Sequence, residues 1–261
     1  ARLAATMNSM LDRLEKSSEQ QRRFVADASH ELRSPLAAIR TELEVGLARG
    51  GATDWPATAV EILLDEARME RLVTSLLALA RLEADHRPPT TEAVNLTPIV
   101  VEDVTAREDV HGVSVRCEVT DDVHAFITAF QARQVITNLV DNAQRHARRE
   151  VVVTLAHDVD GMVQLTVADD GPGVPPADRE VVFERFTRLD GARNHDAGGA
   201  GLGLAIVRDI VVRHQGRVAF TDGAAGARIV VLLPSSAPTV PGGATGGHRQ
   251  PGEGGADGAR P

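Results

Sequence analysis

The sequence is short of lysine and of cysteine, and each shortage excludes a class of site. Among the 28 basic residues only Lys16 is a lysine. The phosphate-binding pattern G-x-x-x-x-G-K-[ST] occurs nowhere, so the glycine-rich segments of the chain do not form a P-loop. Cys117 is the only cysteine. It allows no internal disulfide and no cysteine metal site, which fits a reducing compartment and a role in packing.

Long apolar runs and excess positive charge are also missing. No stretch approaches the roughly 20 apolar residues that cross a bilayer, and no signal-peptide core follows Ala1, so we expect these residues to be soluble by themselves. The net charge of -9 and pI of about 5.5 argue against a nucleic-acid-binding protein, which needs a basic face. A chain of 261 residues with 43% apolar content predicts two modest domains.

The first third of the chain has the heptad spacing of packed helices. Apolar residues recur every three or four positions before a break at Gly50 and Gly51, where Asp54 is placed to cap a second helix and Pro56 suits its first turn. This second helix is expected to end near Ala84. The apolar positions of the two helices are Leu3, Met7, Met10, Leu14, Phe24 and Ala28, then Ile62, Met69, Leu72, Leu76 and Leu79.

One helical hairpin with an apolar stripe on each helix makes a poor core by itself. Two copies would bury both stripes in a four-helix bundle, so the spacing predicts a homodimer.

The pattern changes after the linker at residues 87–89. Short alternating segments at 113–119, 151–155 and 162–167 predict strands, and helical stretches lie between them, which is typical of an α/β sandwich. From Ser235 onward proline, glycine, alanine and threonine dominate. Such a segment buries too little apolar surface to offset its ordering entropy, so we expect disorder there.

Residues 24–36, FVADASHELRSPL, place a histidine beside an acid in a helix-forming run. A neutral imidazole is a nucleophile near pH 7, and a carboxylate that takes the proton of its second nitrogen improves it. Glu31 is such a carboxylate for His30, although adjacent helical residues diverge, so contact depends on side-chain reach or on the bundle partner. Pro35 is expected to bend or loosen the helix, or to be an ordinary tolerated kink.

Three later segments also carry chemistry-bearing residues. In NLVDNA, residues 138–143, Asn138 and Asn142 are four apart and share one helical face, and one or two amide oxygens suit Mg²⁺, which also binds waters and phosphates. DDGPG, residues 169–173, follows a predicted strand, and its carboxylate can accept a hydrogen bond from an exocyclic amine. GGAGLGL, residues 198–204, opens a predicted helix at 205–212, where backbone amides favour phosphate oxygens.

The order and spacing of these four motifs resemble a sensor histidine kinase of a two-component system, over most of the chain from Leu3 to about Pro234. The resemblance implies an all-α helical hairpin, dimerised as a four-helix bundle, followed by an α/β sandwich of the GHKL (Bergerat) type. It also implies Mg-ATP-dependent autophosphorylation of His30 and transfer of the phosphoryl group to an aspartate on a response-regulator receiver domain. We therefore expect ATP and Mg²⁺ as cofactors, a homodimer, and no nucleic-acid partner.

The resemblance also assigns roles to residues. In the helical half, Glu31 assists His30, and Ser34 stands where related kinases carry Thr or Asn to orient water for phosphatase chemistry. Arg185 or Arg188, in the segment FERFTR, would neutralise charge on the transferred phosphoryl group. In the nucleotide site, Asn142 would ligate Mg²⁺ with Asn138 nearby, Asp169 would recognise adenine, and Arg145 and His146 would face the nucleotide. The loop glycines and their neighbour complete the expected site: Gly171, Gly173, Gly199, Gly201, Leu202 and Gly203.

Four parts are expected along the chain. Residues 1–20 resemble the end of a HAMP signalling helix, 21–88 a dimerisation and histidine phosphotransfer domain, and 89–234 an ATP-binding catalytic domain, while 235–261 form a disordered tail. A cytoplasmic portion of a membrane-anchored protein is implied, with the membrane reached only through segments absent from this chain. Transfer within one subunit or between two stays open.

Two other functions remain as alternatives. A GHKL ATPase would share the later motifs but has no need of the histidine hairpin. A phosphatase-biased regulator without kinase activity would keep the heptads and autophosphorylate little.

Overall fold

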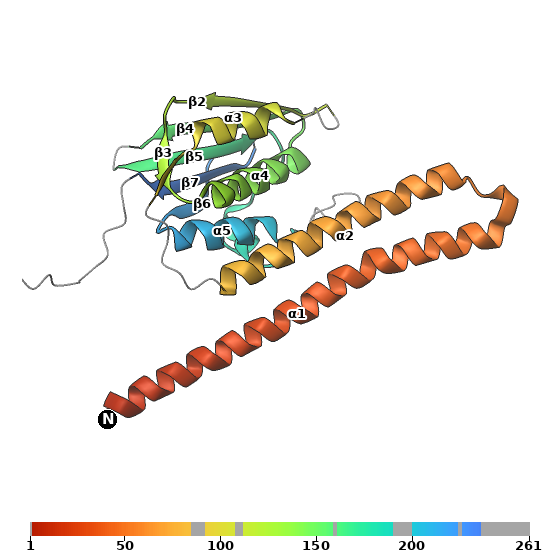
Figure 1. The fold of residues 1–261 in the computed structure, drawn as a ribbon, viewed down its shortest axis with the longest axis horizontal. Coiled ribbons are helices and arrows are strands. Elements are labelled where there is room, and N and C mark those ends of the chain that lie inside the picture. Colours follow the sequence, from red (N-terminus) through yellow and green to blue (C-terminus); the bar gives the residue numbers. More distant parts are fainter. Residues whose placement is uncertain are drawn as a thin grey trace, which may run out of the picture.

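A helical hairpin and an α/β lobe make up the computed structural model, shown in Figure 1. The structure describes residues 2–84, 92–107, 112–158, 161–189, 200–223 and 226–235. Helix α1, Arg2–Arg49, runs into the short 3-10 turn η1, Gly50–Ala52, and α2, Trp55–Ala84, returns beside it. The predicted linker at 87–89 and the predicted tail after Ser235 lie outside the described residues.

The hairpin turn forms as its sequence predicts. Asp54 accepts a hydrogen bond from the backbone N–H of Ala57 at 3.2 Å, which caps the first turn of α2. Thr53 donates its hydroxyl to the carbonyl of Gly46 at 2.8 Å. A Cβ on Gly46 would lie 2.9 Å from the ring of Trp55, so the absent side chain allows the two helices to meet here.

Pro35 lies within α1 without ending it. The helix is continuous from Arg2 to Arg49, and the proline is buried. A single lost N–H donor is tolerated where the neighbouring turns keep their own hydrogen bonds.

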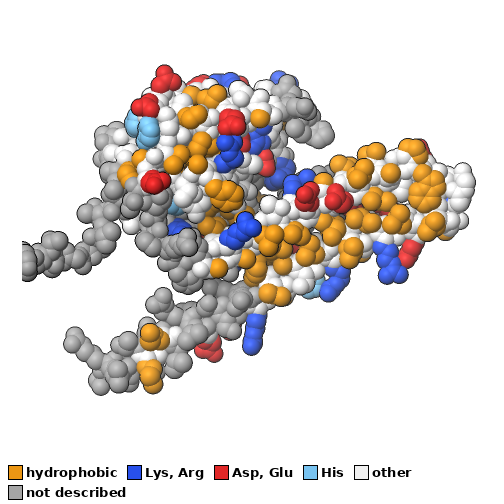
Figure 2. Space-filling model, in the orientation of Figure 1, with side chains coloured by type: hydrophobic (Ala, Val, Ile, Leu, Met, Phe, Trp, Pro, Cys, Tyr) orange, Lys and Arg blue, Asp and Glu red, His pale blue; other side chains and the backbone are white. Residues whose placement is uncertain are grey.

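The hairpin leaves a row of apolar side chains in water. Figure 2 shows them as an orange band along both helices. The row includes Leu36, Leu47, Leu63 and Leu64, which are 58%, 73%, 63% and 65% exposed. A contiguous apolar surface of this kind marks an interaction face.

The α/β lobe is built on a five-stranded sheet with the order β2-β4-β5-β7-β6. Strands β2 and β4 are parallel, and the other neighbours are antiparallel. A separate two-stranded ladder joins β1 to β3. The bounds are β1 Ala93–Asn95, β2 Ser114–Val119, β3 His124–Phe126, β4 Glu150–His157, β5 Met162–Asp169, β6 Arg217–Thr221 and β7 Arg228–Pro234.

Three helices cover one face of this sheet: α3 Thr97–Thr105, α4 Ala129–His146 and α5 Gly203–Arg213 (Figure 1). Strand residues alternate between buried and partly exposed positions, and their buried side chains pack beneath α4 and α5. Two short 3-10 turns lie in the connection between β5 and α5: η2, Pro176–Asp178, and η3, Val181–Phe183. The expected α/β sandwich behind a helical hairpin is therefore confirmed.

The hairpin packs against the lobe. Leu72 and Leu79 of α2 are 4% and 0% exposed and join the core cluster of the lobe. Arg213 of α5 donates to the carbonyl of Leu82 at 3.0 Å. On α1, the Phe24 ring lies 6.0 Å from the ring of Phe186 in the lobe. These contacts fix where α2 runs across the lobe.

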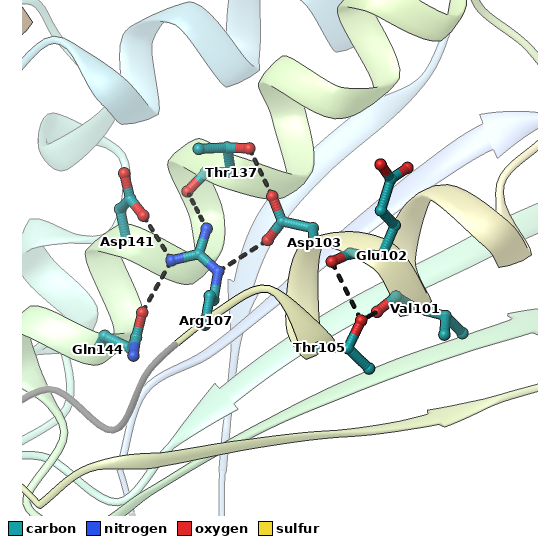
Figure 3. Close-up of polar contacts among 8 residues, drawn as sticks. All are labelled: Val101, Glu102, Asp103, Thr105, Arg107, Thr137, Asp141 and Gln144. Atoms are coloured by element: carbon teal, nitrogen blue, oxygen red, sulfur yellow. Dashed lines mark hydrogen bonds and ion pairs between the residues drawn. The ribbon is translucent and has the colours of Figure 1, made fainter.

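An ion-pair network ties α3 to α4 (Figure 3). Arg107 follows α3 and donates to Asp103 at 2.8 Å, to Asp141 at 2.6 Å and to Gln144 at 2.8 Å. Thr137 also donates to Asp103 at 2.7 Å. The side chains of Arg107 and Asp103 are only 14% and 9% exposed. One guanidinium therefore donates hydrogen bonds to acceptors on two helices.

We expect Arg107→Met to destabilise the lobe by about 3 kcal/mol, because it leaves the buried carboxylate of Asp103 without its cation. Urea unfolding followed by the far-ultraviolet signal measures the change. Arg116→Met is the matched control: its two ion pairs lie on the surface, so a much smaller loss is expected. Equal losses in the two variants would contradict the structural importance of the network.

Candidate functional site

A cavity of about 900 Å³ opens beside α4, and most of the predicted nucleotide-site residues line it. Its walls come from α4, the loop after β5, the start of α5 and one face of α2. Its polar lining residues include Arg68, Arg71, Asn138, Asp141, Asn142, Arg145, His146, Asp169 and Arg188.

Helix α4 presents two asparagines to this cavity because its other face is in the core. Thr128 caps the helix, accepting from the N–H of Gln131 at 3.2 Å. Asn138 donates its amide N–H to the carbonyl of Gln134 at 2.8 Å, and its Oδ1 faces the start of α5. Within the described segments the Asn142 side chain has no hydrogen-bond partner. Amide oxygens are thus available to a hard cation at both positions.

Two neighbouring aspartates at the end of β5 do different things. Asp169 lines the cavity, and its Oδ1 accepts the N–H groups of Gly171 at 2.8 Å and Ala227 at 3.2 Å. Burial raises the pKa of Asp169 in spite of these two bonds. Asp170 instead accepts from the N–H groups of Arg148 and Arg149, at 2.7 and 3.0 Å, and backbone hydrogen bonds lower its pKa. Asp170 anchors the loop after α4, while Asp169 keeps Oδ2 for a ligand.

Two glycines allow this loop to run close to its neighbours. A Cβ on Gly171 would lie 2.3 Å from the carbonyl oxygen of His146. Gly173 has a φ of 75°, in the left-handed region that other residues rarely adopt. Gly173 lines the cavity, whereas Gly171 packs against the end of α4.

The second glycine-rich segment enters α5 at the cavity. Gly201 has a φ of 66°, and its carbonyl accepts the N–H of Phe186 at 2.9 Å. Gly203 begins α5, and a Cβ there would lie 3.1 Å from Asn138 Oδ1. Leu202 lines the cavity but is 1% exposed, so its side chain serves the core. Gly199 lies outside the described residues.

Five basic residues line the cavity: Arg68, Arg71, Arg145, His146 and Arg188. Burial is the main cause that lowers the pKa of Arg145, and the charges of Arg71 and Arg188 lower it further, while Asp141 acts in the opposite direction. Burial, and then the charge of Arg145, lower the pKa of His146. Its imidazole is therefore expected to be neutral at pH 7.

The predicted nucleophile lies away from the cavity. His30 and Ser34 are exposed on α1, one helical turn apart, and Glu31 is partly buried. None of the three lines the cavity, and no hydrogen bond joins His30 to Glu31 in the described part of the chain. A swing of the lobe relative to α1 is needed to bring this histidine and the cavity together.

The two arginines of FERFTR are separated by the structure. Arg188 lines the cavity, whereas Arg185 does not. Arg185 instead lies with its guanidinium carbon 5.4 Å from the centre of the Phe24 ring and pairs with Asp209 at 3.2 Å. In this arrangement of the two parts, Arg188 is the nearer arginine to a bound ligand.

Sequence reasoning missed three features of the site. It did not indicate the network around Arg107, the anchoring role of Asp170, or the arginines of α2 that face the cavity. A lone arginine or aspartate has no periodic signal, so only the fold brings these groups together. Among the described residues, no group of three or more His, Cys, Asp and Glu side chains is arranged to hold a metal.

Two families match this chain. Residues 20–85 match the His Kinase A (phospho-acceptor) domain, and residues 128–237 match the histidine kinase-, DNA gyrase B-, and HSP90-like ATPases. The probable sensor histidine kinase TcrY of Mycobacterium tuberculosis is 37% identical over 246 residues, 89% of this chain and 51% of TcrY. Sensor histidine kinase CusS of Escherichia coli strain CFT073 is 32% identical over 238 residues, 89% of this chain and 49% of CusS. The chain spans about half the length of these curated relatives.

Solved structures share the architecture. The Acinetobacter baumannii histidine kinase AdeS superimposes on 79% of this chain and 98% of the AdeS chain, with a TM-score of 0.64 and 21% identity. This match supports the fold. Full-length ShkA, solved in complex with AMPPNP, superimposes on 82% of this chain and 46% of the ShkA chain, with a TM-score of 0.58 and 25% identity.

The two aspartates predict opposite effects on stability. Because the pKa of Asp169 is raised from its ordinary 3.8, its ionisation costs stability as the pH rises from about 4 through the folded pKa. Asp169→Asn keeps an oxygen that can accept from both N–H donors. We therefore expect its melting temperature to be higher than that of the parent at pH 7 and equal to it at pH 3.5, as measured by thermal unfolding.

Asp170, with a lowered pKa, contributes stability above its folded pKa, so Asp170→Asn lowers the melting temperature at pH 7. Shifts of the same sign would contradict this assignment.

Proposed function

The chain belongs to the sensor histidine kinases of two-component systems, and we propose on that premise that it autophosphorylates His30 from Mg-ATP and passes the phosphoryl group to an aspartate of a response-regulator receiver domain. Residues 21–88 act as the dimerisation and phosphotransfer domain, and residues 89–234 as the ATP-binding catalytic domain. Residues 1–20 end a HAMP signalling helix.

The observation that carries this proposal is the cavity beside α4. Its free groups match the parts of a nucleotide: Asp169 Oδ2 accepts from an adenine amine, and the Asn142 amide, which has no protein partner in the described segments, offers its oxygen to Mg²⁺. Gly201 and Gly203 leave room for phosphates at the start of α5. The residues therefore fit Mg-ATP, which supplies the transferred phosphoryl group when bound.

The exposed imidazole of His30 is the acceptor. Its neutral form offers one ring nitrogen to phosphorus, while Glu31 takes the proton from the other. Because His30 lies outside the cavity, the lobe has to swing to align the two. Ser34, one turn further along the same exposed face, orients water for hydrolysis of the regulator's phospho-aspartate. Arg185 or Arg188 balances the charge that develops on the phosphoryl group.

A homodimer covers the exposed apolar row of the hairpin. Leu43, Leu47, Leu63 and Leu64 are all more than a third exposed in one chain, and a second hairpin buries such rows in a four-helix bundle. The match of residues 20–85 to the phospho-acceptor domain supports this arrangement over an ATPase that needs no hairpin.

We also propose that the whole protein is attached to a membrane. In the described ranges, no helix is both long and apolar enough for a membrane span. The HAMP-like start of α1 supports a whole protein that is anchored upstream of residue 1.

We expect His30→Gln to abolish the acid-labile, alkali-stable phosphoryl label from radiolabelled ATP, a loss of about 10³-fold or more, because no other group accepts the phosphoryl. Nucleotide affinity should be unchanged, since His30 does not line the cavity. The control is His157→Gln, at an exposed histidine at the end of β4, which should label like the parent. A His30→Gln protein that still carries the label refutes the assigned nucleophile.

Asn142→Ala should weaken Mg-ATP binding by at least about tenfold, because it removes an oxygen ligand of the cation. The melting temperature and the dimer should not change, since this side chain has no protein hydrogen bond in the described segments. Calorimetric titration with and without Mg²⁺ measures the effect. Asn95→Ala loses a surface bond to Asp122 and the N–H of Thr97 at the start of α3, and it is the control for nucleotide affinity because Asn95 does not line the cavity. An Asn142→Ala affinity that matches the parent in Mg²⁺ would remove this residue from the metal site.

A further inference from the structure

Helix α2 of the hairpin forms one wall of the nucleotide cavity. Arg68, Arg71 and Ser75 line the cavity together with residues of α4 and α5. They are spaced three and four apart, so they share a face of α2. Leu72 and Leu79, buried beside them in the core of the lobe, hold this face in place. The wall is thus part of a packed interface.

Arg71 is a cation without a counter-ion in this wall. No ion pair to Arg71 is found among the described residues, although Arg40 and Arg107, also in or beside helices, have i,i+4 partners. Its charge acts on Arg145 of α4, as does that of Arg188 from the loop after η3. With Arg68 of α2, four guanidinium groups from three elements therefore line one cavity.

Arg71 and Arg145 are exposed, so an incoming anion can reach this cluster. Acidic residues also line the cavity, among them Glu70, Asp141 and Asp178, and Asp141 Oδ1 already accepts from Arg107 at 2.6 Å. Asp169 is also in the cavity, and its carboxylate repels phosphate. The polyphosphate of a nucleotide is then drawn to the arginines, and guanidinium groups bind phosphate oxygens with paired hydrogen bonds.

We propose that Arg71, a residue of the hairpin, binds the terminal phosphate of ATP while the lobe is docked on α2, so that the hairpin distinguishes ATP from ADP. This inference rests on the proposed function, since it assigns a further ligand to the same nucleotide site. Arg145 and Arg188, which belong to the lobe, contact whichever phosphates are present. Arg71 contributes only in the docked arrangement.

The assignment has a thermodynamic consequence. If docking strengthens ATP binding through Arg71, ATP strengthens docking by the same factor. Conversion of ATP to ADP then weakens the hold of the lobe on α2.

Calorimetric titration of the full chain with Mg-ATP and Mg-ADP tests the proposal. All proteins carry His30→Gln so that the nucleotide is not consumed. We expect Arg71→Ala to weaken ATP binding by about tenfold, which is the effect of losing one hydrogen bond to a charged group. ADP binding should weaken by less than about twofold. The preference of the protein for ATP over ADP should therefore fall. Arg71→Lys, which keeps the charge without the planar fork, should restore part of the ATP affinity.

Arg81→Ala is the matched control, because Arg81 is an exposed arginine of the same helix that does not line the cavity. It should leave both affinities unchanged. Equal weakening of ATP and ADP by Arg71→Ala, or no change in either, would overturn the role of Arg71 and leave the proposed function standing. A parent protein that binds neither nucleotide would overturn the proposed function and this inference together.

Discussion

Helix α4 has to bury one face and present the other, and the rest of the lobe depends on this constraint. Its apolar face packs on the sheet, its asparagine face lines the cavity, and Arg107 sets its position against α3 through Asp141 and Gln144. The packing of one face of this helix in the core therefore fixes the positions of the asparagines on its other face. The buried positions are Ala132, Val135, Ile136, Leu139, Val140 and Ala143.

Features with a local signal could be predicted from the sequence. The turn at Asp54, the strands at 114–119, 150–157 and 162–169 and the shared face of Asn138 and Asn142 follow from capping and periodicity, which involve residues close along the chain. The positive φ of Gly201 is of the same kind, because only glycine adopts it without strain. The short ladder of β1 and β3 gave no such signal, since three-residue strands are too brief to show alternation.

Contacts between distant segments could not be predicted. Leu72 and Leu79 have heptad spacing and were expected in the stripe between two hairpins, yet in this chain the lobe covers them. Periodicity indicates which face is buried but not what covers it. The same limit applies to Arg185 and Arg188. Both lie in the segment FERFTR, and only the tertiary fold places one beside Phe24 of α1 and the other at the cavity.

The contact of Phe24 with the lobe links mechanical input to chemistry. Phe24 lies less than two turns before His30 on the same uninterrupted helix, and its ring touches Phe186 and the guanidinium of Arg185. A rotation of α1 would therefore move His30 and the contact of Phe24 with the lobe together. Phe186 already holds a φ of 60°, an unfavourable conformation for an aromatic residue. The contact between Phe24 and Phe186 thus couples α1 to a strained backbone position of the lobe.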